Sequence, residues 1–92
     1  MNVKLSSGFL KKLKKIDVRI RKSFKERIIV FSKDPSDPQL DNHPLKREWK
    51  GHRSIDITAD YRAIYKETQI GDENVAYFVA LGTHDELYRR KS

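Results

Sequence analysis

Four side chains able to move a proton or bind a phosphate lie in loops or at the ends of predicted strands. His43 lies in a polar loop, Asp60 in a short turn, Arg62 directly after that turn, and His84 just after the last predicted strand. An imidazole accepts or donates a proton near neutral pH. A guanidinium binds the non-bridging oxygens of a phosphate. This set favours cleavage of RNA through its own 2′-hydroxyl, a reaction that uses a base, an acid and a cation.

Basic and aromatic residues accompany these four. Bases that leave the stack are bound by aromatic rings, and the RNA backbone is bound by cations. Structural alternatives exist: Trp49 fits packing against the core better than stacking on a base, and Arg62 can pair with Asp56 or Glu67 across the sheet. The candidate RNA-binding residues are Lys46, Lys50, Arg53, Tyr61 and Tyr88.

The sequence predicts neither a metal site nor a cofactor. His43, His52 and His84 have no HxH or HExxH spacing, and the chain has no cysteine. A chain without cysteine forms no disulfides and is compatible with a reducing cytoplasm, where we expect the protein to act. No apolar run approaches the ~20 residues of a membrane span, and residues 1–16 lack the apolar core of a secretory signal.

The chain is basic, with a formal net charge of +7 over 92 residues, and the charge is unevenly distributed. Residues 1–33 hold 11 lysines and arginines against 2 acidic residues, whereas residues 34–92 hold 9 against 11. Such a basic region favours an acidic partner, either a nucleic acid or an acidic protein. The length predicts a single domain over residues 1–92, and a hydrophobic content of 37% supplies one core.

Residues 7–33 have the hydrophobic periodicity of helices. Asp17 offers a second N-cap after Ser6 or Ser7, so two helices meeting near residues 16–18 are expected instead of one. Pro35 and Pro38 end the helical region, because proline lacks an N–H and restricts the residue before it. The apolar residues recur at steps of three or four along this region: Phe9, Leu13, Ile16, Ile20, Phe24, Ile28 and Phe31.

Strand patterns occupy most of the second half. Apolar and polar residues alternate over residues 54–58 and 61–66, which predicts two half-buried strands. Residues 75–81 are apolar at both odd and even positions, as in a central strand, and residues 71–74 are expected to form a hairpin loop. Residues 1–5 predict an edge strand, residues 35–51 an irregular loop, Gly82 a break, and residues 85–90 a short terminal helix. The fold class is α+β: an N-terminal strand and helix pair packed on a small antiparallel sheet. Antiparallel strands then bring the Asp60 turn and residues 82–84 to one end of the sheet.

Four motifs resemble the RelE/ParE superfamily of bacterial toxins, closest to its YafQ-like mRNA interferases. They are HPL at 43–45, WKGHR at 49–53, DYRAIY at 60–65 and GTHDELY at 82–88. The resemblance implies a RelE-like fold and a toxin of a type II toxin–antitoxin system. It further implies cleavage of mRNA in the ribosomal A site, inhibition of translation, and a cognate antitoxin partner.

By motif position, His43, Asp60 and His84 fall where YafQ-like enzymes place catalytic groups, and Arg62 matches a strand arginine used on the phosphate. Tyr88 matches an aromatic residue near the site, and Tyr61 stands where the nearest relatives have tryptophan. One departure is Asp56, which replaces a histidine found in the first strand of the sheet in many YafQ-like enzymes. The role assignment is His84 as general acid, His43 or Asp60 as general base, and Arg62 as phosphate stabiliser.

Three alternatives remain open from the sequence. A ParE-like toxin would poison DNA gyrase with the same fold and tolerate loss of His84. A non-catalytic RNA-binding module would depend on the basic helices instead. An inactive relative would retain only antitoxin binding, with Asp56 marking the lost catalysis.

Overall fold

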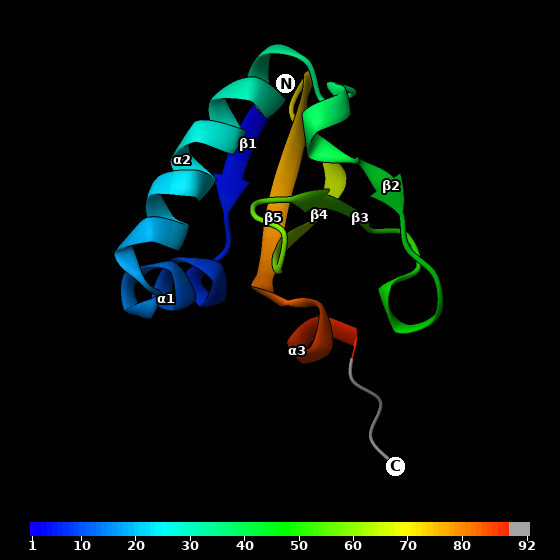
Figure 1. The fold of residues 1–92 in the computed structure, drawn as a ribbon. Helices are drawn as coiled ribbons and strands as arrows, with labels where there is room; N and C mark the ends of the chain where they lie inside the picture. The colour runs from blue at the N-terminus through cyan, green and yellow to red at the C-terminus, as the bar shows by residue number, and fades with distance from the viewer. Residues whose placement is uncertain (89–92) are drawn as a thin grey trace.

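In the computed structural model, which describes residues 1–88, two helices lie on one side of a twisted sheet (Figure 1). Helix α1 spans Ser7–Lys15 and helix α2 spans Val18–Lys33. The Oγ of Ser6 accepts the backbone N–H of Phe9 at 3.1 Å, and the Oδ1 of Asp17 accepts that of Arg19 at 2.7 Å. These caps satisfy first-turn N–H groups, which confirms the two predicted helices and the break between them.

The sheet is mixed. Within residues 1–88 it has five strands in the order β1-β5-β4-β3-β2. Their bounds are Asn2–Leu5 for β1, His43–Pro44 for β2, Arg53–Asp56 for β3, Tyr61–Ile70 for β4 and Glu73–Thr83 for β5. Strands β3 to β5 form the predicted antiparallel series, β2 adds to it as an antiparallel strand beside β3, and β1 is the predicted edge strand. Strand β1 runs parallel to β5, because the helix pair carries the chain across the sheet before the antiparallel strands return beside it.

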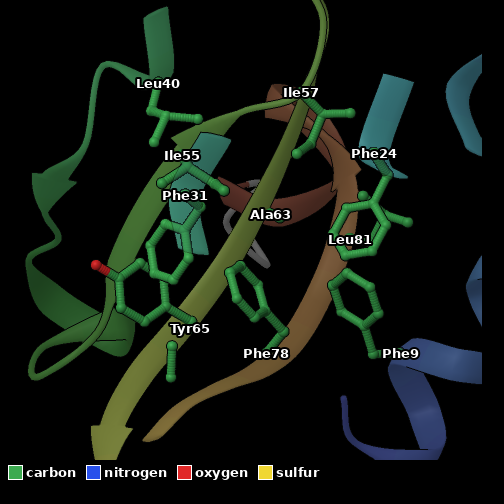
Figure 2. Close-up of a cluster of buried hydrophobic side chains, with 11 residues drawn as sticks. Phe9, Phe24, Phe31, Leu40, Ile55, Ile57, Ala63, Tyr65, Phe78 and Leu81 are labelled. Atoms are coloured by element: carbon green, nitrogen blue, oxygen red, sulfur yellow. The ribbon is translucent and has the colours of Figure 1, made fainter. Parts of the chain in front are cut away.

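The core lies between the helices and the sheet. Phe31 of α2 makes edge contacts with Tyr65 and Phe78, at ring-centroid distances of 5.0 and 5.4 Å. Figure 2 shows these rings beside Phe9 and Phe24, which come from the two helices. The apolar stripe read from the sequence is therefore the buried face, and it fixes how the helices sit on the strands that carry the candidate site.

Residues 35–51 are more ordered than the sequence indicates. A 3-10 turn spans Pro38–Leu40, strand β2 follows, and a second 3-10 turn spans Arg47–Trp49. The side chain of Leu40 is fully buried and anchors this segment to the core. Strand β2 escaped prediction because its two residues cannot show a period.

The end of β5 also differs from prediction. Gly82 does not break the strand: it lies within β5 and pairs with Arg62 of β4. Helix α3 then spans His84–Tyr88, and the remainder of the predicted terminal helix, residues 89–90, lies outside the described residues. Within residues 1–88, no helix is both long enough and apolar enough to cross a membrane.

Candidate active site

An open pocket of about 420 Å³ lies where β2, the start of β4 and helix α3 meet. It brings together three of the four predicted catalytic side chains, His43, Arg62 and His84. Two of the predicted RNA-binding residues, Lys46 and Tyr88, line the same pocket. Two imidazoles, a guanidinium and an ammonium group therefore face one cavity that is open to solvent.

Strand pairing explains this convergence. His43 pairs with Ser54 at the edge of the sheet, and Arg62 pairs with Gly82 two strands away. The backbone N–H of His84 donates to the carbonyl of Asp60 at 3.3 Å, which joins the start of α3 to the β3–β4 turn. The predicted meeting of the Asp60 turn with residues 82–84 is thereby confirmed.

The ring of His43 is oriented by the backbone of Asp41, two residues earlier in the chain. Its Nδ1 lies 2.7 Å from the carbonyl oxygen of Asp41. A carbonyl can only accept, so Nδ1 carries the proton in this contact and the neutral ring keeps its lone pair on Nε2. Asp41 adopts a left-handed backbone (φ 45°), lines the pocket, and has its carboxylate 3.9 Å from the same Nδ1. Sequence reasoning missed Asp41, although a short polar residue after Leu40 is the kind that tolerates this conformation.

Arg62 is held by its own strand pair and by the turn before it. Its Nε lies 3.0 Å from the Oδ1 of Asp56, the residue directly opposite on β3. Its Nη1 donates to the carbonyls of Thr58, Ala59 and Tyr61 at 3.0–3.2 Å. The pairing with Asp56 was one of the two structural alternatives for Arg62. The part of the guanidinium left for a phosphate is Nη2, which makes no hydrogen bond within residues 1–88.

The carboxylate of Asp56 is partly buried beside Arg62, which makes its charged form costly. Burial raises the pKa of its carboxyl above the usual value, and attraction to the guanidinium of Arg62 only partly offsets that rise. Its Oδ1 is buried and, in the described chain, accepts no aligned hydrogen bond, so the contact with Arg62 is an ion pair. A histidine at this position would place no negative charge against the arginine.

The rings of His84 and Tyr88 lie in tilted contact on one face of α3, with centroids 4.6 Å apart. The helix is secured by a reciprocal cap. The Oγ1 of Thr83 accepts the N–H of Glu86 at 3.2 Å, and the Oε1 of Glu86 accepts the N–H of Thr83 at 2.8 Å. That backbone hydrogen bond lowers the pKa of Glu86, with help from Lys12, whose Nζ lies 3.2 Å from the carboxylate.

Asp60, the fourth predicted catalytic residue, lies in a neighbouring pocket. This second pocket, of about 430 Å³, is lined by Asp60, Tyr61, Thr83 and His84. His84 alone of these lines both pockets among the described residues. Asp60 therefore lines a different pocket from His43 and Arg62, and His84 lines both.

Lys50 and Arg53 do not line either pocket. Lys50 is exposed and follows the second 3-10 turn. The Nε of Arg53 donates to the Oδ1 of Asn42 at 2.8 Å, and the amide nitrogen of Asn42 donates to the hydroxyl of Tyr65. Arg53 thus holds the strand that carries His43. The indole N–H of Trp49 donates to the carbonyl of Leu87 at 2.9 Å, in keeping with the structural interpretation of that residue.

Residues 1–88 contain no group of three or more histidine and acidic side chains arranged to hold a metal ion. The arrangement consists of two histidines and cations around an open pocket. Such a set can take a proton, give a proton and bind an anion between them.

The fold and the family comparison define the class. The architecture is that of the RelE/YafQ-like superfamily of toxins, with a mixed sheet, a covering helix pair and a short terminal helix. A family model described as the bacterial toxin of type II toxin–antitoxin systems, YafQ, matches residues 1–89. The chain belongs to this family. A comparison with curated protein sequences gave no match.

Solved structures agree with this assignment. YafQ from E. coli strain BL21(DE3) is similar over 95% of this chain and 97% of its own, with 25% identity and a TM-score of 0.75. The YoeB/ParE toxin from Agrobacterium tumefaciens shares the fold over 91% of this chain and 99% of its own, with 21% identity and a TM-score of 0.72. YafQ in the E. coli DinJ–YafQ complex matches 95% of this chain and 97% of its own, with 26% identity and a TM-score of 0.65.

Proposed function

We propose that this toxin is an endoribonuclease that cleaves mRNA in the ribosomal A site and so inhibits translation. The observation that carries the proposal is the shared pocket of His43, Arg62 and His84. Two groups able to transfer protons and one phosphate-binding cation are the set that cleavage through a 2′-hydroxyl needs.

The reaction follows from these groups. The Nε2 of His43 takes the proton of the 2′-hydroxyl, and the 2′-oxygen attacks the adjacent phosphorus. The bond from phosphorus to the 5′-oxygen breaks, and His84 gives a proton to that oxygen as it leaves. The products are a 2′,3′-cyclic phosphate and a 5′-hydroxyl. Arg62 and Lys46 stabilise the negative charge that accumulates on the non-bridging oxygens.

The placement of the groups favours His43 over Asp60 as the base. His43 lines the pocket with Arg62, and the carbonyl of Asp41 fixes its Nδ1 proton so that Nε2 is the accepting atom. Asp60 faces the neighbouring pocket, with Tyr61. There the two residues suit a flanking nucleotide, with the ring of Tyr61 against a base.

A cognate antitoxin and the ribosome are the proposed partners. The solved relatives include toxin–antitoxin complexes, DinJ–YafQ from E. coli and RelBE2 from Mycobacterium tuberculosis. Helices α1 and α2 carry ten of the twenty lysines and arginines against one acidic residue, and this charge favours an acidic surface. Action on mRNA during translation places the toxin in the cytoplasm.

Primer extension on a reporter mRNA tests the proposal. The transcript is examined after brief induction of the wild type, of His84→Ala, and of Gln69→Ala as a control on the exposed far end of β4. We expect cuts within translated codons for the wild type and the control, and none for His84→Ala, because loss of a general acid costs ~10²–10⁴ in rate.

Other outcomes contradict the proposal and point elsewhere. Arrested growth with intact mRNA would indicate a ParE-like gyrase poison. Normal growth with intact mRNA would indicate a non-catalytic RNA-binding module or an inactive toxin. Cleavage that persists in a folded His84→Ala variant would remove His84 from the acid role.

A further inference from the structure

The two histidines of the pocket come from elements that share no strand pairing. His43 belongs to β2, a two-residue edge strand, and His84 begins α3, a five-residue helix beyond the end of β5 (Figure 1). Neither element is long enough to hold its position by its own hydrogen bonds. Besides the β2–β3 pairing and the His84–Asp60 hydrogen bond, the separation of the two imidazoles therefore depends on direct contacts between the segments that carry them.

Residues 45–52 form a closed loop that extends the β2–β3 pair. The N–H of Leu45 donates to the carbonyl of His52 at 3.0 Å, and the N–H of His52 donates to that of Trp49 at 2.9 Å. Gly51 makes the turn with a positive φ of 88°, which a residue with a side chain rarely adopts. The ring of His52 packs edge-on against the indole at 5.4 Å. The loop thus holds the indole in one orientation and connects it to the end of β2.

The indole joins this loop to α3. Its Nε1–H donates to the carbonyl of Leu87 at 2.9 Å, between residues 38 positions apart in the chain. Leu87 lies in the last turn of α3, where a carbonyl has no partner within the helix. The bond satisfies that carbonyl at a half-buried position. Leu87 lies between His84 and Tyr88, so the bond acts on the helix segment that carries both pocket residues.

We propose that Trp49 is a positioning residue, which ties loop 45–52 to helix α3 and so sets the separation of His43 and His84 across the pocket. This inference rests on the proposed function. Trp49 lines neither pocket in the described chain, and its indole N–H is bonded to α3, which supports action through that helix.

A change of one group tests the proposal. Trp49 is the single tryptophan of the chain, so growth on a tryptophan analogue alters this position alone. Benzothienylalanine replaces the N–H by sulfur and keeps the shape of the ring, and 7-azatryptophan keeps the N–H as a matched control. Trp49→Phe is a genetic variant that also lacks the donor. Cleavage of mRNA on purified ribosomes and hydrogen exchange of the amides of α3 are measured for each form.

We expect the forms without the N–H to show kcat reduced about tenfold, with KM unchanged and faster exchange in α3, because the carbonyl of Leu87 loses its partner and the helix that carries His84 is no longer tied to loop 45–52. The 7-azatryptophan form should match the wild type. An unchanged kcat, or a raised KM with unchanged kcat, would overturn the proposal, since the second result marks a stacking residue. If the wild type does not cleave at all, the proposed function fails. Exchange in α3 then still decides whether Trp49 holds that helix.

Discussion

Asp56 and Arg62 face each other across β3 and β4, with the Oδ1 of Asp56 3.0 Å from the Nε of Arg62. The pair places a carboxylate beside a guanidinium at the edge of a pocket suited to phosphate. Burial makes the charged form of this carboxylate costly despite its partner, as its raised pKa shows. The contact therefore holds Arg62 in place and lowers its availability to an anion.

Replacing Asp56 by asparagine should stabilise the fold in a pH-dependent way. The pKa of Asp56 is raised above 3.8 in the folded state, so the unfolded chain ionises first as pH rises and the wild type loses stability through that window. The free energy of unfolding of Asp56→Asn minus that of the wild type should therefore grow as pH rises from about 3.8 and then level off. Urea unfolding from pH 3 to 7 measures this difference. A difference that shrinks with rising pH would contradict the assignment.

The same change should strengthen RNA binding. Removing the negative charge frees the Nε of Arg62 and reduces repulsion of phosphate, so KM for mRNA should fall by roughly 1.5- to 5-fold, the range of one partly exposed charge pair. Glu67→Gln, on the same strand as Arg62 but exposed and outside both pockets, is the control. Equal KM values for Asp56→Asn and the wild type would show that Arg62 does not contact the phosphate.

His43 and Asp60 can be separated as candidates for the base. We expect His43→Gln to lose ~10²–10⁴ in kcat, because glutamine cannot take the proton. Asp60→Asn should lose tenfold or less, mainly through KM, since Asp60 lines the neighbouring pocket. Single-turnover cleavage on programmed ribosomes measures both. The reverse order of losses would transfer the base role to Asp60.

The cap of α3 gives a fourth prediction. Glu86→Ala removes the acceptor of the Thr83 N–H and should lower the free energy of unfolding by about 1 kcal/mol at pH 7. Because the pKa of Glu86 is depressed below 4.5, this stabilisation is present above that pH and is lost as pH falls through the folded-state value. The gap between variant and wild type should close in acid. Glu67→Ala, an exposed glutamate on β4, should show no such closing gap.

Substitution of Gly82 is predicted to be unfavourable because a side chain there would contact Glu86. A Cβ at this position would lie 3.2 Å from the Oε1 and 3.3 Å from the Cβ of Glu86, so Gly82→Ala requires Glu86 of α3 to shift by a few tenths of an ångström. We expect lower kcat and a loss of about 1 kcal/mol in stability, as for other crowded substitutions. Gly8→Ala meets nothing within 4 Å in helix α1 and should stabilise by ~0.5–1 kcal/mol. Thermal unfolding compares the two, and equal melting temperatures would refute the crowding.

The helices and long strands could be predicted because their signals are local. The Ser6 and Asp17 caps and the stripe from Phe9 to Phe31 specify two helices on one face, and alternation specifies β3 and β4. Strand β2 was missed because its two residues are ordered by Ser54 and Arg53 from another part of the chain. Gly82 was assigned to a break because glycine usually weakens strands, whereas the space it leaves is used by Glu86.

The residues of the candidate site could be predicted from the sequence, but most of the contacts that orient them could not. Chain direction places His84 near the Asp60 turn, and the motifs point to His43 and Arg62. The contacts that orient these groups depend on side chains from distant segments, such as the indole of Trp49 on Leu87. A cap signature was nevertheless present in Thr83 and Glu86, three residues apart, and could have indicated where α3 begins.

The parallel pairing of β1 with β5 has a consequence for the order of folding. Asn2 pairs with Val75, and Leu5 with Phe78, so β1 can join the sheet only after β5 has been synthesised. A contact between such distant residues closes a loop of about 70 residues. Closing this loop is slow, because its entropy is lost before the strand contacts that offset the loss have formed. The α1–α2 hairpin can form early, but its apolar face stays uncovered until β5 emerges. A nascent toxin therefore cannot complete its sheet, or the pocket at the end of β5, until β5 has been translated as far as Thr83.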